Sequence, residues 1–130
     1  MKKEDFTKGQ LVYLYVISGS NEYRRLKSHN ETDVPIDKRI IPTTVISIGK
    51  RFITVAYGNL KFDITDDFKE YSNYSKDYEL FLDKESIYNK NKSDKLFNCI
   101  KHYFSNTYKN VFTAEQLEQV VNILNLTDNR

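Results

Sequence analysis

The sequence has few of the residues that mark a disulfide scaffold, a membrane span or a proline-rich linker. Its 130 residues include one cysteine, two prolines, four glycines and no tryptophan. The single Cys99 cannot form an internal disulfide, which suits a reducing compartment. No apolar run approaches the ~20 residues that cross a bilayer, and no apolar stretch follows the charged N-terminus as it would in a signal peptide. We therefore expect a cytoplasmic protein with no membrane partner.

Motifs of catalysis, phosphate binding and metal binding are also missing from the sequence. The two histidines, His29 and His102, fall in no H-E-x-x-H pattern, and neither G-x-S-x-G nor a glycine-rich phosphate loop occurs. The acidic group between residues 63 and 70 lacks the spacing of a calcium loop, so it is interpreted as a solvated turn. We expect no enzyme activity, no cofactor and no metal site.

Charge is present but unevenly distributed. The formal net charge is +2, with an excess of basic residues up to residue 62 and an excess of acidic residues after it. Such a chain can present a basic face to an anionic partner while remaining close to neutral overall.

Strand-like alternation fills the first part of the chain. Apolar or aromatic residues recur with period two between turns at Gly49-Lys50 and Gly58-Asn59. We predict strands over residues 11–17, 39–48, 52–57, 60–64 and 78–82, in one antiparallel sheet or barrel. Pro42 is expected at an edge or a bulge, because it cannot donate to a ladder. The polar connection at 19–38 is predicted to be a functional loop or to contain a short strand near residues 23–28.

Helical spacing replaces this alternation after residue 83. Asp83 is a predicted cap for a short helix over 84–89, and Ser93 for the next helix. Thr113 and Gln116 form a predicted capping box for the last helix. The apolar stripe of the middle helix is expected to be buried, together with Cys99. Its residues are Leu96, Phe97, Ile100, Tyr103 and Phe104.

The partner-binding residues are predicted from the positions of arginine and tyrosine, because these two residue types are enriched at tight interfaces. A basic and aromatic loop at residues 23–29 is the first choice, because arginine binds carboxylate or phosphate through paired donors and tyrosine offers a stacking face. Further basic residues and a tyrosine-rich segment extend the set. The predicted partner-binding residues are Tyr23, Arg24, Arg25, Lys27, Arg39, Arg51, Tyr71 and Tyr74.

Three segments together suggest a family resemblance: GQLVYLYVISGS, TVISIGKRFITVAYGNLKFDI and YELFLDKESI, followed by helices. The chain resembles small uncharacterised phage and mobile-element proteins of low-GC Gram-positive bacteria with an N-terminal SH3-like barrel. The resemblance implies an accessory or host-takeover role, including inhibition of a host defence enzyme, and it transfers no site residues. The fold class expected from the strands and helices is α+β: a small antiparallel SH3-like β-barrel over residues 1–82, and a C-terminal helical hairpin over 83–130 packed on it.

Two functions remain open at this point. The first is a non-catalytic protein-binding module, an adaptor or inhibitor of a host protein, favoured by the tyrosines and arginines. The alternative is a DNA- or RNA-binding accessory protein that uses the basic N-terminal half. The salt dependence of binding separates the two, since phosphate contacts weaken steeply as salt rises.

Overall fold

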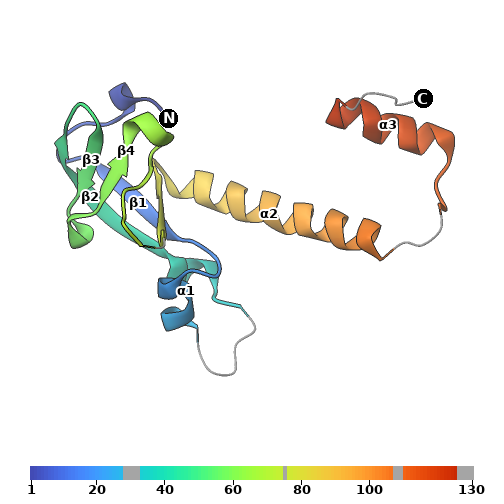
Figure 1. Cartoon of the computed structure of the whole chain (residues 1–130), viewed down its shortest axis with the longest axis horizontal. Helices are drawn as coiled ribbons and strands as arrows, with labels where there is room; N and C mark the ends of the chain where they lie inside the picture. Colours follow the sequence, from blue (N-terminus) through green and yellow to red (C-terminus); the bar gives the residue numbers. More distant parts are fainter. Residues whose placement is uncertain (28–32, 75, 107–109, 126–130) are drawn as a thin grey trace. The chain divides into compact units, whose positions relative to one another are not determined.

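The computed structural model describes residues 1–27, 33–74, 76–106 and 110–125 (Figure 1). Six antiparallel strands form a closed barrel in sequence order, with β6 pairing back onto β1. The strands are β1 (Leu11–Val16), β2 (Ile40–Ile48), β3 (Phe52–Val55), β4 (Lys61–Asp63), β5 (Lys69–Glu70) and β6 (Tyr78–Phe81). The helices are α1 (Asn21–Leu26), α2 (Lys84–Ser105) and α3 (Ala114–Leu124). The α+β prediction of a small antiparallel barrel followed by helices is confirmed.

Short 3-10 turns complete the chain path at Lys3–Asp5, Ile36–Arg39, Tyr57–Asn59 and Ile64–Asp66. The turn between β3 and β4 places Gly58 and Asn59 at φ values of 60° and 52°. Two consecutive left-handed residues match the twist of a tight hairpin, and glycine and asparagine adopt that region at the least cost.

The barrel interior is filled by alternate residues of the strands. Val12 and Leu14 of β1, Ile53 of β3 and Phe62 of β4 are each fully buried. They belong to one cluster with Val45, Val55, Leu80, Phe6 and Phe68. The period-two alternation predicted for these segments is therefore present, and the structure shows which of the two faces is buried.

Strand β2 changes partner halfway along its length, which explains how it accommodates a proline. Its first half pairs with β1, where Pro42 lies opposite Tyr13, and its second half pairs with β3 after an irregularity between Val45 and Ser47. Pro42 therefore lies where β2 has a single neighbour, as expected of an edge position.

The segment after β1 differs from the prediction, because it contains a helix and not a strand or an open loop. Ser20 caps α1 by accepting a hydrogen bond from the backbone N–H of Tyr23 at 3.1 Å. Tyr23 is the buried residue of this short helix and packs with Val16 and Val34. With one buried side chain in six residues, α1 shows no apolar period that sequence reading could detect.

Two further elements were also predicted wrongly. Asp83 caps α2 as expected, accepting from the N–H of Ser86 at 2.7 Å, but α2 continues without a break through Ser93. Strand β5 was not predicted at all, since two residues are too few to show alternation.

The chain divides into two compact units, Met1–Asp94 and Lys95–Arg130. The first turns of α2 belong with the barrel: Ile87 is fully buried, and the hydroxyl of Tyr88 donates to the Asp37 carboxylate at 2.8 Å. Among the described residues, none of the helices is long and apolar enough to cross a membrane.

The apolar stripe of α2 was expected to be buried, and that expectation is wrong. Phe97 is 64% exposed and Ile100 is 58% exposed, while Leu96, Tyr103 and Phe104 are each about half exposed. Cys99 is exposed as well. Helical periodicity showed correctly that these apolar residues share one face, but it cannot show whether anything covers that face.

Candidate functional site

One exposed face of the barrel combines aromatic rings with basic groups. We call it the Arg51 face, and its residues are Arg51, Phe52, Lys61 and Tyr71. Phe52 begins β3 and Lys61 begins β4, while the N–H of Tyr71 bonds the carbonyl of Lys61 at 2.8 Å. The pairing of Phe52 with Asp63, and of Thr54 with Lys61, places these side chains on the face opposite to the buried Ile53 and Phe62.

Arg51 is held in place from two sides. Its Nε and Nη2 donate to Oδ2 of Asp63 at 3.1 and 3.0 Å. Its guanidinium lies over the rings of Phe52 and Tyr71, with the central carbon 4.9 and 5.3 Å from the two centroids. The arginine side chain is nevertheless 55% exposed, so a largely accessible cation has a fixed orientation.

Asp63 is a well-supported partner for this arginine. The hydroxyl of Thr65 donates to Asp63 Oδ1 at 2.6 Å, and the backbone N–H of Thr65 donates to the same atom at 3.0 Å. The Thr65 hydroxyl and then Arg51 hold the pKa of Asp63 below its ordinary value. The carboxylate therefore stays ionised and keeps Arg51 in position.

The two rings of the Arg51 face form a small platform. Phe52 and Tyr71 have their centroids 4.9 Å apart and are tilted by 53°. The Lys61 ammonium lies 5.6 Å from the Phe52 centroid, and Tyr71 is 52% exposed. This arrangement offers a flat apolar contact bordered by two cations, and aromatic and cationic groups of this kind attract each other.

The predicted partner-binding residues are distributed over several places. Arg51 and Tyr71 come together on the Arg51 face. Tyr74, in the same tyrosine-rich segment as Tyr71, is 89% exposed. Phe52 and Lys61 were missed; the signal for Phe52 was its position one residue away from the inward-facing Ile53.

Two predicted residues lie in the interior, where their contacts hold the fold together. Arg39 is 6% exposed and donates from Nε and Nη2 to the carbonyl of Val16 at 3.0 and 2.8 Å. Its guanidinium lies over the rings of Tyr15 and Tyr23. The Tyr23 hydroxyl donates to the Asp33 carboxylate.

The remaining predicted residues lie on or beside α1. Arg24 and Lys27 are exposed, and Arg25 donates to Glu22 at 2.6 Å. His29 and its neighbours from 28 to 32 lie outside the described residues. The basic loop expected at 23–29 is thus largely a short helix with one buried tyrosine.

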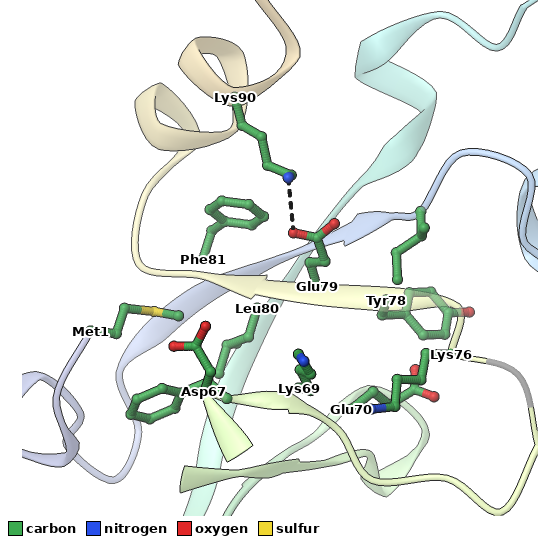
Figure 2. Close-up of a pocket in the computed structure, with 12 residues that line it drawn as sticks. Met1, Asp67, Lys69, Glu70, Lys76, Tyr78, Glu79, Leu80, Phe81 and Lys90 are labelled. Atoms are coloured by element: carbon green, nitrogen blue, oxygen red, sulfur yellow. Dashed lines mark ion pairs between the residues drawn. The ribbon is translucent and has the colours of Figure 1, made fainter. Parts of the chain in front are cut away.

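A cavity of about 470 Å³ opens where β5 meets β6 (Figure 2). The two strands pair there through Lys69 and Glu79 alone, and Figure 2 shows Lys90 of α2 reaching Glu79, with 3.6 Å between the charged groups. Glu70 lies at this junction and is 5% exposed. Its Oε1 has no hydrogen-bond partner among the described residues, and burial raises its pKa above the ordinary value.

The acidic residues between 63 and 70 serve separate purposes. Asp63 binds Arg51, and Asp66 lies 3.9 Å from the ammonium groups of both Lys69 and Lys76. Within the described parts of the chain, no group of three or more His, Cys, Asp or Glu side chains is positioned to hold a metal ion.

Comparison with known proteins gives a family but no close relative. Neither the curated proteins nor the solved structures provide a match to this chain. The model of one family, described as the phage ProQ C-terminal-like domain, matches residues 1–130. That match covers the barrel and the helices together, and it agrees with the expected link to phages. The chain belongs to the phage ProQ C-terminal-like domain family.

Proposed function

We propose that this phage-related chain is a non-catalytic binding protein that holds a host protein on its Arg51 face, as an adaptor or as an inhibitor of a host defence protein. The observation that carries the proposal is the exposed Arg51, fixed by Asp63 and stacked on Phe52 and Tyr71. Arginine and tyrosine are the residue types that most often dominate binding energy.

The order already present in this face supports tight binding. Immobilising a flexible side chain costs about 0.5–1.5 kcal/mol on association. Arg51 has already lost much of that freedom to its two bonds with Asp63. A partner would therefore meet a rigid platform of two rings and a guanidinium.

The charges around the platform favour an acidic partner surface. Lys61 borders the rings, and Lys50, which is exposed, precedes Arg51 in the turn between β2 and β3. Complementary charge of this kind raises the association rate and excludes basic partners.

Single-stranded nucleic acid is a second candidate, favoured by the same platform. Unpaired bases stack on exposed aromatic rings, and lysines beside the rings bind phosphates. Phe52 and Tyr71 with Lys61 provide both groups. The protein partner is the first choice because an arginine stacked on a fixed tyrosine is typical of protein-binding hot spots.

The first experiment is affinity purification from host cells, with and without nuclease treatment. The expected result is a co-purifying protein that survives nuclease. Tyr71→Ala should weaken its binding by about tenfold or more, the loss expected of a hot-spot residue. Tyr74→Ala is the matched control, because it removes an exposed tyrosine outside the Arg51 face, and it should change affinity by about twofold or less.

Several outcomes would contradict this assignment. Loss of the partner on nuclease treatment, with an affinity that falls steeply as salt rises, would indicate the nucleic-acid function. Full binding by a correctly folded Tyr71→Ala protein would exclude the Arg51 face. If Arg24→Ala with Arg25→Ala then abolished binding, the exposed side of α1 would be the site.

A further inference from the structure

Arg51 uses one edge of its guanidinium for bonds within the chain. The donors of that edge, Nε and Nη2, both reach Oδ2 of Asp63, at 3.1 and 3.0 Å. Within the described part of the chain, no other side chain accepts a hydrogen bond from Arg51. Because the five N–H donors of a guanidinium lie in one rigid plane, the edge formed by Nη1 and Nη2 keeps two parallel N–H groups. We call it the free edge of Arg51.

The orientation of the free edge is set by a buried carboxylate. The side chain of Asp63 is 7% exposed, whereas that of Arg51 is 55% exposed. Thr65 fixes Asp63 in turn, because its hydroxyl and its backbone N–H both donate to Oδ1, at 2.6 and 3.0 Å. Each carboxylate oxygen of Asp63 therefore has its own donors, and rotation of the carboxylate would break both sets of bonds.

The protein group that fits two parallel N–H donors is a carboxylate. Among unmodified side chains, only Asp and Glu present two anionic acceptor oxygens in one plane. The guanidinium lies over Phe52 and Tyr71, and Tyr71 is 52% exposed, so an apolar side chain beside that carboxylate has a ring to contact. The Lys61 ammonium, 5.6 Å from the Phe52 centroid, provides a second cation on the same face.

We propose that the Arg51 face recognises an acidic segment of its protein partner, in which an Asp or Glu carboxylate takes the free edge of Arg51 and a neighbouring apolar side chain lies on the rings. Thr65 is a positioning residue in this recognition, because it acts through Asp63 and not by contact with the partner. The inference rests on the proposed function and adds the chemical group that the face selects. Glutamine in place of the acid should be rejected, since its NH2 group meets the N–H groups of Arg51.

Two blocked peptides test this selection on the full chain without any host protein. The probes are acetyl-Glu-Phe-Glu-amide and the corresponding Gln-Phe-Gln peptide, titrated while NMR follows the backbone amide signals of Phe52 and Tyr71. The glutamate peptide should bind about tenfold more tightly than the glutamine peptide. Arg51→Lys should reduce this ratio to about threefold or less, because lysine keeps the charge but lacks the paired donors.

Substitution of Thr65 separates positioning from a general loss of structure. Thr65→Val removes the hydroxyl donor and keeps the branched shape, so it should lower the ratio by about threefold and leave binding of the glutamine peptide unchanged. Thr65→Ser should restore the ratio. Arg25→Lys is the matched control and should leave the ratio unchanged, because Arg25 is an exposed arginine that pairs with Glu22 at 2.6 Å outside the Arg51 face.

Three outcomes would overturn the inference. The first is equal affinity for the two peptides, or a ratio that survives both Arg51→Lys and Thr65→Val. The second is no binding of the glutamate peptide at about 10 mM. Either result leaves the proposed function intact, because that function depends on the captured host protein and its response to Tyr71→Ala. The third is a dinucleotide that binds more tightly than the glutamate peptide, which would contradict the protein-binding function as well.

Discussion

Two arginines in this chain show the same chemistry in opposite settings. Both lie over two aromatic rings and both donate through Nε and Nη2. Arg39 donates to a backbone carbonyl in the interior and is 6% exposed. Arg51 donates to the buried Asp63 carboxylate, but its own side chain is 55% exposed. Both arginines were predicted to bind a partner, because the sequence shows the type of each residue but not whether its side chain is buried.

The buried carboxyl of Glu70 should make the stability of this protein depend on pH. Burial raises the pKa of its carboxyl, so the folded state disfavours the ionised form. A raised carboxyl pKa leaves stability intact below the unfolded pKa and reduces it as pH rises through the folded pKa. Glu70→Gln should therefore raise the free energy of unfolding at pH 8 and change it little near pH 4, as measured by urea denaturation.

A surface carboxylate provides the control for that measurement. Glu79 is paired with Lys90, and its side chain is 36% exposed. Glu79→Gln should show no gain between pH 4 and pH 8. A Glu70→Gln protein that is less stable at pH 8 would mean that the ionised carboxylate, bonded to the N–H groups of Asp77 and Tyr78, is required.

At the scale of elements, sequence patterns predicted the strands and helices that are long enough to show a hydrophobic period. The strands around Val12, Ile53 and Phe62 were found because alternation marks an inward face. Helix α1 and strand β5 were missed because one buried tyrosine and two residues carry no period. The Arg51 face could not be assembled from sequence, because Arg51 and Tyr71 are brought together only by the pairing of β3, β4 and β5.

The start of α3 was predicted fully, and its energetic value can be measured. Thr113 Oγ1 accepts from the N–H of Gln116 at 3.1 Å, and Gln116 Oε1 accepts from the N–H of Thr113 at 3.0 Å. Thr113→Ala should destabilise α3 by about 0.5–2 kcal/mol, because it leaves a helix N–H without its partner. Amide hydrogen exchange in α3 reports this loss.

Thr113→Ser is the matched variant, since serine retains the accepting hydroxyl oxygen. Its exchange rates should lie close to those of the unchanged protein. Equal acceleration in the serine and alanine variants would show that the cap contributes nothing to α3.

At the scale of the whole molecule, the two units differ in what their apolar residues do. In Met1–Asp94 the apolar side chains fill a barrel, and Phe62 is fully buried. In Lys95–Arg130 they lie on exposed helix faces, and Ile100 is 58% exposed. Hydropathy alone assigns the same role to both residues, whereas the structure buries Phe62 in the core and leaves Ile100 exposed on a helix face.

Matched truncations should reveal that difference in thermal or urea unfolding. Phe62→Ala should cost about 3–5 kcal/mol, the usual loss for a buried aromatic residue. Ile100→Ala should cost under about 1 kcal/mol in dilute protein, as expected of an exposed residue. The burial expected from the sequence would instead have implied about 2–5 kcal/mol for Ile100. A large loss for Ile100 that persists at every protein concentration would show that its face is buried within one chain.

The closed barrel also constrains the order in which this chain can fold. Hairpins β2–β3 and β3–β4 join neighbours in sequence, whereas closure pairs Tyr13 of β1 with Phe81 of β6. Bringing distant segments together costs more chain entropy than closing a short turn. We therefore expect the central meander around Ile53 to form in the folding transition state and the β1–β6 seam to form after it. Shortening the side chain by Ile53→Ala should then slow folding, while Leu80→Ala should mainly accelerate unfolding, as measured by stopped-flow folding and unfolding rates.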